Sequence, residues 1–290
     1  MEIYASTTFL GSTRTHLSEA LSALRSLDLD GIELGSTHFW QSDLKELVTK
    51  LWNKEILTHN YFPPSKDNII LNIASNNPKI RNASIEHMKF CIQFAADIGA
   101  KIYTIHPGFL VEPQNTRENL KERSFDFSYS TNQTPYEIAF KLMKNALIEL
   151  INVANEVNVF LAIETEGSMT SAGVALMESP SEYERLFNEI QDGLFLNLNL
   201  SHTILSAKAN GFDVGSFINK FKGYVVAVEL SDNDGYRDQH KPLSSDSKVV
   251  EWIPKLPDVP LILEFRCATQ VDLAESIAIL RNTEEFGVNK

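Results

Sequence analysis

The sequence predicts an α/β protein built as a single-domain (β/α)8 TIM barrel, and two observations favour this fold. Short apolar runs, typical of parallel strands buried on both faces, alternate with amphipathic helical segments about eight times. No repeat or linker interrupts the alternation, and 290 residues that are 43% hydrophobic suffice for one large core. A doubly wound open sheet is the competing architecture, but the glycine-rich phosphate loop expected after its first strand is missing from the sequence.

The first half of the chain reads as strands and helices in alternation. Strands are predicted where apolar residues alternate or cluster, at 2–8, 31–35, 55–61 and 101–106. Helices are predicted where apolar residues recur every three or four positions, at 16–27, 42–52 and 84–99. Ser42 is a suitable N-cap for the second of these helices, and Gly99 is a suitable stop for the third.

The second half continues the same pattern after a long helix at 135–157. Strands are predicted at 159–164, 194–200, 224–228 and 260–265. Helices are predicted at 179–190, 207–221, 245–256 and 270–282. The helix at 207–221 is the weakest of them, because Gly211 interrupts it.

A polar segment at 111–134 is longer than an ordinary connection between packed elements. We expect it to form an excursion over the mouth of the barrel. It mixes basic and aromatic residues, which suits a lid or a subunit contact, although a mobile loop fits equally well. These residues are Arg117, Lys121, Arg123, Phe125, Phe127 and Tyr129.

Composition narrows the class of protein. The formal net charge of -12 argues against a generally basic nucleic-acid surface, although a local basic groove is compatible with it. No apolar run of about 18 residues suggests a membrane span, and the N-terminal residues lack the pattern of a signal peptide. We therefore expect a cytoplasmic protein, with Cys91 and Cys267 as reduced core thiols.

The predicted strand ends carry most of the side chains capable of chemistry. The carboxyl ends of the strands of a (β/α)8 barrel share one face, where active sites lie. In chain order these ends present Glu33, His59, His106, Glu164, Asn199 with His202, Glu229, and Glu264. Asp238 and His240 follow in the next loop, spaced so that an extended backbone aims both at one point.

A single histidine or glutamate among them would more often be a structural residue than a ligand. Carboxylates packed this closely repel one another, however, unless cations or protons intervene. The whole set on one rim therefore predicts a bound divalent metal.

Several short segments, in their order and spacing, resemble one known family along nearly the whole chain. They are THNY at 58–61, LNIAS at 71–75, DIGA at 97–100 before IYTIHPG at 102–108, AIE at 162–164, NLSH at 199–202, GFD at 211–213, DQH at 238–240 and LILE at 261–264. Together they resemble the xylose isomerase-like barrels. That family comprises sugar isomerases and epimerases and the endonuclease IV type of abasic-site nuclease.

The resemblance implies up to three metal positions. One, which we call the first histidine centre, consists of His59, His106 and Glu164. Another, the second histidine centre, consists of His202, Asp238 and His240. The last, the carboxylate centre, consists of Glu164, Asn199, Glu229 and Glu264.

The sequence departs from the family at two positions of the carboxylate centre. The family usually has Asp where this chain has Asn199, and His where it has Glu229. Three carboxylates and one neutral donor are nevertheless retained, so we interpret the two changes as compensating. Loss of the metal at this position, followed by drift, is the alternative. Replacing an imidazole by a carboxylate would shift preference from Zn towards Mn or Mg.

The leading hypothesis is a divalent-metal-dependent isomerase or epimerase of a small-molecule sugar or sugar phosphate. The resemblance implies that Glu164 and Glu264 exchange roles as base and acid, removing a proton next to a carbonyl through a metal-stabilised enediolate. Four aromatic residues at loop starts are candidates for the pocket. They are Trp40, Phe62, Phe109 and Phe212.

Two other functions remain open from the sequence. The complete histidine centres also suit a metal-dependent phosphodiesterase of the endonuclease IV type, whereas the acidic balance counts modestly against a nucleic-acid substrate. A barrel that only binds a sugar or a partner would account for the altered carboxylate centre. A homo-oligomer is compatible with each of these candidate functions.

Overall fold

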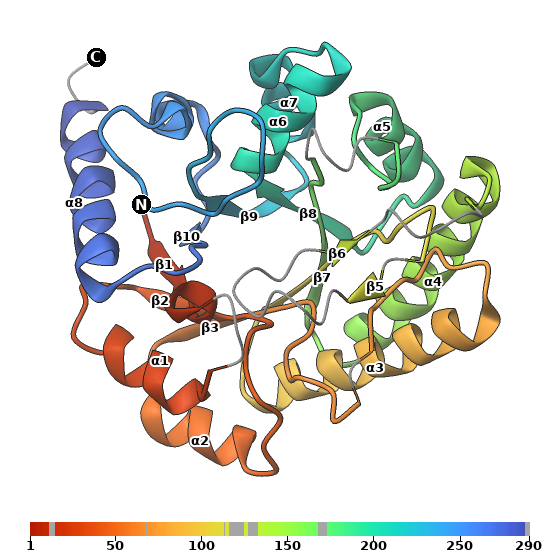
Figure 1. Ribbon diagram of the computed structural model, residues 1–290, viewed down its shortest axis with the longest axis horizontal. Helices are drawn as coiled ribbons and strands as arrows, with labels where there is room; N and C mark the ends of the chain where they lie inside the picture. Colours follow the sequence, from red (N-terminus) through yellow and green to blue (C-terminus); the bar gives the residue numbers. More distant parts are fainter. Residues whose placement is uncertain are drawn as a thin grey trace.

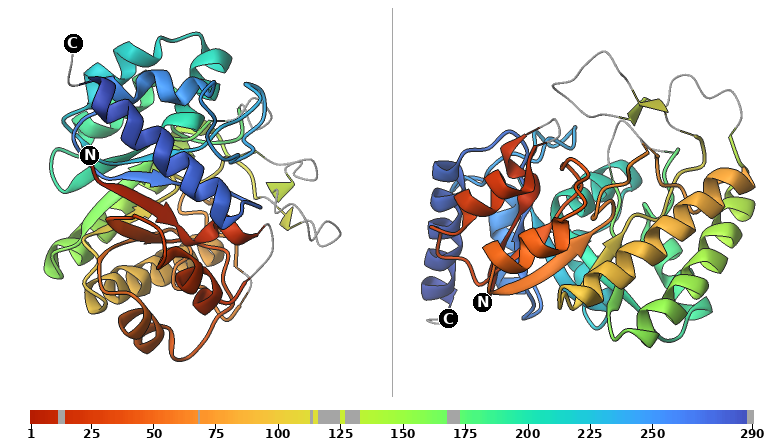
Figure 2. Two further views of the ribbon diagram at one scale, coloured as in Figure 1. Left: turned by 90° about the vertical axis from the view of Figure 1, so that its left-hand side faces the viewer. Right: turned by 90° about the horizontal axis from the view of Figure 1, so that it is seen from below.

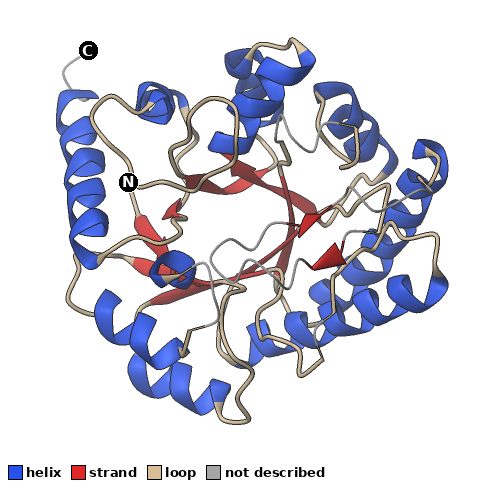
Figure 3. Ribbon diagram, in the orientation of Figure 1, coloured by secondary structure: helices blue, strands red, loops and turns tan. Residues whose placement is uncertain are grey.

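Eight parallel strands close into a barrel in the computed structural model, which describes residues 1–11, 15–67, 69–112, 114–115, 125–126, 133–167 and 173–287. The strand order around the barrel is β1-β10-β9-β8-β7-β4-β3-β2, with helices outside the strands (Figures 1 and 3). The strands are β1 (Ile3–Ser6), β2 (Gly31–Leu34), β3 (Glu55–His59), β4 (Ile102–Ile105), β7 (Phe160–Glu164), β8 (Leu194–Asn199), β9 (Val225–Leu230) and β10 (Leu261–Leu263). The predicted fold class is therefore confirmed.

Helices follow the strands in chain order and form the outer layer. The α-helices are α1 (Leu17–Leu24), α2 (Leu44–Leu51), α3 (Pro78–Asp97), α4 (Tyr136–Glu156), α5 (Pro180–Glu189), α6 (Leu200–Asn210), α7 (Val214–Phe221) and α8 (Gln270–Gly287). Two 3₁₀ helices complete the set, η1 (Thr7–Leu10) after β1 and η2 (Lys248–Lys255) before β10. Within the described residues, no helix combines the length and apolar character needed to cross a membrane.

Helix boundaries differ from the sequence prediction where a local cap decides them. α3 begins at Pro78, earlier than predicted, because the side chain of Asn77 accepts a hydrogen bond from the Lys79 amide and caps the helix. The predicted helix at 207–221 is two helices, because Gly211 adopts φ 73° and ends α6 in the left-handed region. The predicted helix at 245–256 is the 3₁₀ helix η2, with Pro254 inside it.

Part of the predicted excursion at 111–134 is described. β5 (Gln114–Asn115) and β6 (Phe125–Asp126) pair antiparallel and stand beyond the end of the barrel opposite to the N-terminus (Figure 2, right). The other residues on which the prediction of a lid or subunit contact rests lie outside the described residues. They are Arg117, Lys121, Arg123, Phe127 and Tyr129.

The barrel interior has an apolar floor below a polar layer. The floor is a buried cluster of Tyr4, Leu57, Ile102, Ala162, Ala227 and Ile262. Residues two positions further along a strand point to the same side, and on these six strands they are polar. They are Ser6, His59, Thr104, Glu164, Glu229 and Glu264. Side chains alternate along a strand with a period of two residues, and this alternation places the polar layer inside the barrel at the strand ends.

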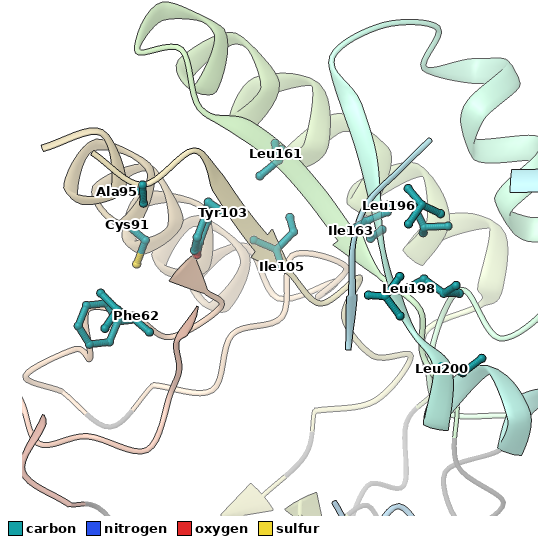
Figure 4. Packing of buried hydrophobic residues seen from close by; sticks show 14 of the residues in the cluster. Phe62, Cys91, Ala95, Tyr103, Ile105, Leu161, Ile163, Leu196, Leu198 and Leu200 are labelled. Atoms are coloured by element: carbon teal, nitrogen blue, oxygen red, sulfur yellow. The ribbon is translucent and has the colours of Figure 1, made fainter. Parts of the chain in front are cut away.

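The main core lies between the strands and the helices. Figure 4 shows Ile105, Ile163 and Leu196 from β4, β7 and β8 in this layer, with Cys91 of α3 nearby. Cys91 is fully buried, as predicted for a core thiol. The prediction was wrong for Cys267, which is exposed because it lies in the loop that leaves the barrel after β10.

Candidate functional site

The structure brings every predicted site residue together at the carboxyl end of the strands. Most of them are buried, because the strand alternation points them into the barrel, while His106 and Asp238 are partly exposed. The set consists of His59, His106, Glu164, Asn199, His202, Glu229, Asp238, His240 and Glu264. A face that is polar, titratable and buried has the composition of a reactive site.

The first histidine centre is assembled around one carboxylate. Nε2 of His59 lies 2.8 Å from Oε2 of Glu164, and Nδ1 of His106 lies 3.3 Å from the same oxygen. One donor atom from each of the three residues lies within 4.8 Å of the others. The three residues come from β3, β7 and the end of β4, which neighbour one another in the barrel.

The second histidine centre is assembled around Asp238. Oδ2 of Asp238 lies 2.8 Å from Nε2 of His240 and 3.2 Å from Nε2 of His202. Nε2 of His202 and Oδ1 of Asp238 are buried and have no hydrogen-bond partner within the part of the chain that the structure describes. Nε2 of His202 thus lies close to the Asp238 carboxylate without the geometry of a hydrogen bond. The imidazole nitrogen and the carboxylate oxygen are arranged like two ligands of one metal ion.

The carboxylate centre is assembled around the amide of Asn199. Its Nδ2 atom lies 3.0 Å from Oε1 of Glu164, 2.9 Å from Oε2 of Glu229 and 3.3 Å from Oε2 of Glu264. Its Oδ1 atom accepts a hydrogen bond from the His202 amide and caps α6. The amide nitrogen therefore occupies the middle of the carboxylates, where a cation would otherwise compensate their charge.

The surroundings shift the pKa values of the buried carboxylates in opposite directions. Burial raises the pKa of Glu164, but His106, His202 and His59 outweigh burial and hold that pKa well below its ordinary value. Burial also raises the pKa of Glu264, and the neighbouring His240 reverses the net direction.

Glu229 behaves in the opposite way. Burial and the negative charges of Glu164 and Glu264 raise the pKa of Glu229 well above its ordinary value. At neutral pH, Glu164 and Glu264 are therefore ionised, whereas the surroundings of Glu229 favour its neutral form.

The histidines compensate the ionised carboxylates. Burial lowers the pKa of His59, but Glu33 and Glu164 outweigh it and raise the pKa to about 9. Burial and Arg266 lower the pKa of His240, but Asp238 and Glu264 raise it to about 9. Both imidazoles are thus protonated at neutral pH, and they give up these protons if a metal takes their place.

Sequence reasoning missed two residues of the site. Oε1 of Glu166 accepts a hydrogen bond from Nδ1 of His106 at 2.6 Å, although Glu166 lies beyond the end of β7. Nδ2 of Asn197 donates to Oε1 of Glu229 at 2.6 Å. Asn197 could have been found, because it lies two positions before Asn199 on β8 and points to the same side.

The predicted pocket aromatics separate into two groups. Phe62 is fully buried and packs against Phe94, with ring centroids 5.7 Å apart, so it is a core residue. Phe212 packs against the core beside Phe217. Trp40 and Phe109 are partly exposed in the loops after β2 and β4, and they remain candidates.

The closed parallel barrel and the buried histidine and carboxylate face define a barrel protein with a site for polar chemistry at the strand ends. The family described as "Xylose isomerase-like TIM barrel" matches residues 21–282. The chain belongs to this family.

Individual relatives are distant. An uncharacterized protein of Methanocaldococcus jannaschii, MJ1311, is 23% identical over 262 residues, which cover 88% of this chain and 78% of that protein. A solved D-tagatose 3-epimerase-like protein superposes with a TM-score of 0.77 at 17% identity, covering 100% of this chain and 99% of its own. D-psicose 3-epimerase from Clostridium cellulolyticum H10, solved with D-tagatose, gives 0.72 at 10% identity, covering 98% and 99%. These structures share the fold of this chain.

Proposed function

We propose that this protein is a divalent-metal-dependent isomerase or epimerase of a sugar or sugar phosphate. The observation that carries the proposal is the pair Glu164 and Glu264. Both are buried, both are ionised, and both contact the same Asn199 nitrogen from different strands. Two ionised carboxylates that converge on one point suit the removal of a proton and its return. The similarity to sugar 3-epimerases supports the same class of reaction.

The residues present fit a divalent cation. The histidine centres offer imidazole nitrogens and carboxylate oxygens, a mixture that Zn²⁺ and Mn²⁺ accept. Nε2 of His202 and Oδ1 of Asp238 are buried and find no hydrogen-bond partner among the residues that the structure describes, which is costly unless a ligand satisfies them. When bound, a cation would polarise the substrate carbonyl and stabilise the negative charge that develops on its oxygen.

The chain's own groups move the proton. One ionised carboxylate, Glu164 or Glu264, accepts the proton next to the carbonyl. The other takes up a proton from solvent before the reaction and gives it to the product, so the two carboxylates exchange roles after each turnover. His59 donates to Oε2 of Glu164, and Nδ1 of His240 lies 3.1 Å from Oε2 of Glu264, so each carboxylate is held in place by an imidazole. Burial of the pair excludes water from the proton that is transferred.

Isosteric variants test the proposal. Glu164→Gln and Glu264→Gln should each lower turnover of the accepted sugar at least 100-fold, because an amide cannot take the proton. Glu178→Gln changes a buried glutamate in the loop before α5 that belongs to none of the three centres, so it serves as the matched control and should retain activity. Product formed in deuterated water should carry deuterium at the carbon that loses the proton. Full activity of both site variants would refute the assignment.

A phosphodiesterase of the endonuclease IV type is the second candidate. The specific observation in its favour is that both histidine centres are complete and assembled. Incision of a duplex with one abasic site, dependent on added metal and lost in His106→Ala, would assign this activity instead.

A binding protein without catalysis is the third candidate. The Asn199 amide satisfies Glu164, Glu229 and Glu264 without an ion, which favours a carboxylate centre that has lost its metal. Elemental analysis tests this reading, because protein that contains no metal and ignores added Zn²⁺ and Mn²⁺ would support it.

A further inference from the structure

Glu33 is a buried carboxylate that none of the three centres uses. It lies near the end of β2, is 0% exposed, and neither of its carboxylate oxygens has a hydrogen-bond partner among the described residues. Leaving a buried polar group unpaired costs on the order of 1 to 3 kcal/mol, and more for a charged group. A chain that keeps such a group inside its barrel is expected to satisfy it with something other than its own side chains.

Other unsatisfied atoms line the same polar layer. Nδ1 of His59 is buried and has no hydrogen-bond partner in the described ranges, while its Nε2 is hydrogen-bonded to Glu164. Oδ1 of Asn197 is also buried without a partner. The orientation of the Asn197 amide is fixed, because its nitrogen donates to Oε1 of Glu229 at 2.6 Å and to Oγ1 of Thr104 at 3.1 Å. An imidazole nitrogen and an amide oxygen are left as available electron-pair donors.

Glu33, His59 and Glu229 form a compact set. One donor atom from each lies within 4.8 Å of the others, and all three side chains are buried. We propose that these residues hold a divalent cation inside the barrel, at a position that we call the inner site. It is separate from the carboxylate centre, because it uses Glu33 and requires neither Asn199 nor Glu264.

Charge and ligand type indicate the class of ion. Two carboxylates and a neutral imidazole balance a charge of +2, so occupation leaves no net charge in a dry interior. Two oxygen ligands and one nitrogen ligand suit Mn²⁺ or Zn²⁺ better than Ca²⁺. We assign the ion a structural and charge-balancing role, because it would neutralise two carboxylates that are both 0% exposed.

Sharing of His59 links the inner site to the first histidine centre. A neutral imidazole has one free lone pair and one N–H. If Nδ1 binds the inner ion, Nε2 carries the hydrogen and donates it to Oε2 of Glu164, the contact seen at 2.8 Å. If Nε2 instead binds an ion with His106 and Glu164, Nδ1 carries the hydrogen and cannot bind the inner ion. The two positions therefore compete for His59.

Metal stoichiometry with Mn²⁺ alone tests the inner site. Chelator-treated protein is loaded with MnCl2, and bound metal per chain is measured by elemental analysis after gel filtration. Because the two positions compete for His59, the comparison is made in His106→Ala, which removes a ligand of the first histidine centre. In that background Glu33→Gln should bind one ion fewer than His106→Ala alone. Asp238→Asn removes a ligand of the second histidine centre only, so it should lose a different ion, and combining it with Glu33→Gln should lose both. Unchanged stoichiometry and affinity on adding Glu33→Gln to His106→Ala would overturn the inference.

Anomalous scattering decides the case if Glu33→Gln does not fold. Crystals of the parent chain grown with MnCl2 should show a peak between Glu33, His59 and Glu229. Peaks at the histidine centres with none at the inner site would refute the inner site and leave the proposed function standing. A parent chain that shows the inner peak but turns over no sugar would refute the proposed function and leave the inner site standing.

Discussion

Changing Asn199 to Asp tests how the carboxylate centre is held together. The aspartate keeps an oxygen that can accept from the His202 amide, so the cap of α6 is preserved. The N–H donors to Glu164, Glu229 and Glu264 are lost, and a further negative charge is placed among them. The perturbation is therefore electrostatic, with almost no change in shape.

The size of the destabilisation follows from the number of N–H hydrogens on the Asn199 amide. The amide offers two, and a hydrogen bond to a charged group contributes about 1.5 to 3 kcal/mol. We expect Asn199→Asp to lower the free energy of unfolding by about 3 to 6 kcal/mol in the presence of chelator, before any repulsion is added. For a chain of this length that corresponds to a fall of the thermal midpoint on the order of 10 °C.

Thermal unfolding with EDTA and with MnCl2 provides the assay. An ion bound only by the folded state raises the midpoint in proportion to the strength of its binding, so Mn²⁺ should raise the midpoint of Asn199→Asp less than that of the parent chain if the fourth carboxylate unbalances the centre. Asn77→Asp at the exposed cap of α3 is the matched control and should shift little. A variant as stable as the parent in EDTA would refute the role assigned to the amide.

The same assay tests whether Asn199 and Glu229 compensate for each other. The two side chains are in contact at 2.9 Å, so their substitutions should be non-additive. Asn199→Asp combined with Glu229→His restores the donor types usual in the family. We expect the double variant to bind Mn²⁺ near the affinity of the parent chain and both single variants to bind more weakly. Additive effects would refute compensation.

Further predictions concern the surroundings of the site. Glu166→Gln should weaken metal binding at the first histidine centre about 10- to 100-fold by titration calorimetry, because a hydrogen-bonded carboxylate fixes the tautomer of a histidine ligand. With chelator present, the thermal midpoint should fall as the pH is raised from 6.5 to 9. In the folded protein the pKa values of His59 and His240 are each raised to about 9, so protonation of these imidazoles stabilises the fold fully below the unfolded pKa of about 6.5. This stabilisation is lost as the pH rises through 9. Gly31→Ala should destabilise the fold by about 1 to 3 kcal/mol in urea unfolding, because its methyl group would lie 2.1 Å from Cε1 of Tyr4.

Each of these predictions has a control. Glu166→Gln should leave the second histidine centre unchanged, and equal loss at both centres would indicate a general structural defect. Protein loaded with Mn²⁺ should lose less stability than chelated protein between pH 6.5 and pH 9, since ions replace protons on the imidazoles. Gly223→Ala, where an added methyl group meets nothing within 4 Å, should be nearly neutral.

The polar layer could be predicted from the sequence because two regular patterns determine it. Parallel strands buried on both faces read as apolar runs, and a (β/α)8 barrel brings all their carboxyl ends to one face. His59, Glu164 and Glu264 each end or follow such a run. Their meeting therefore follows from the topology, without knowledge of any side-chain contact.

The remaining features of the site depend on local geometry, which the periodicity of strands and helices does not determine. Glu166 lies past the end of β7, where the alternation stops, so nothing in the sequence orients it towards His106. The double use of the Asn199 amide, as a cap through its oxygen and as a donor through its nitrogen, requires α6 to start directly after β8. Phe62 follows a strand end like a pocket residue, yet α3 covers it through Phe94.

The two kinds of centre differ in how readily they exchange protons for metal. In the histidine centres, imidazolium groups pair with carboxylates, and a divalent ion can replace their protons while the side chains stay in place. In the carboxylate centre the compensating group is the Asn199 amide, which has no proton to release at any ordinary pH. Turning its oxygen towards an ion would break the hydrogen bond that caps α6. The histidine centres should therefore bind metal first, and the carboxylate centre should bind it only at the expense of the α6 cap.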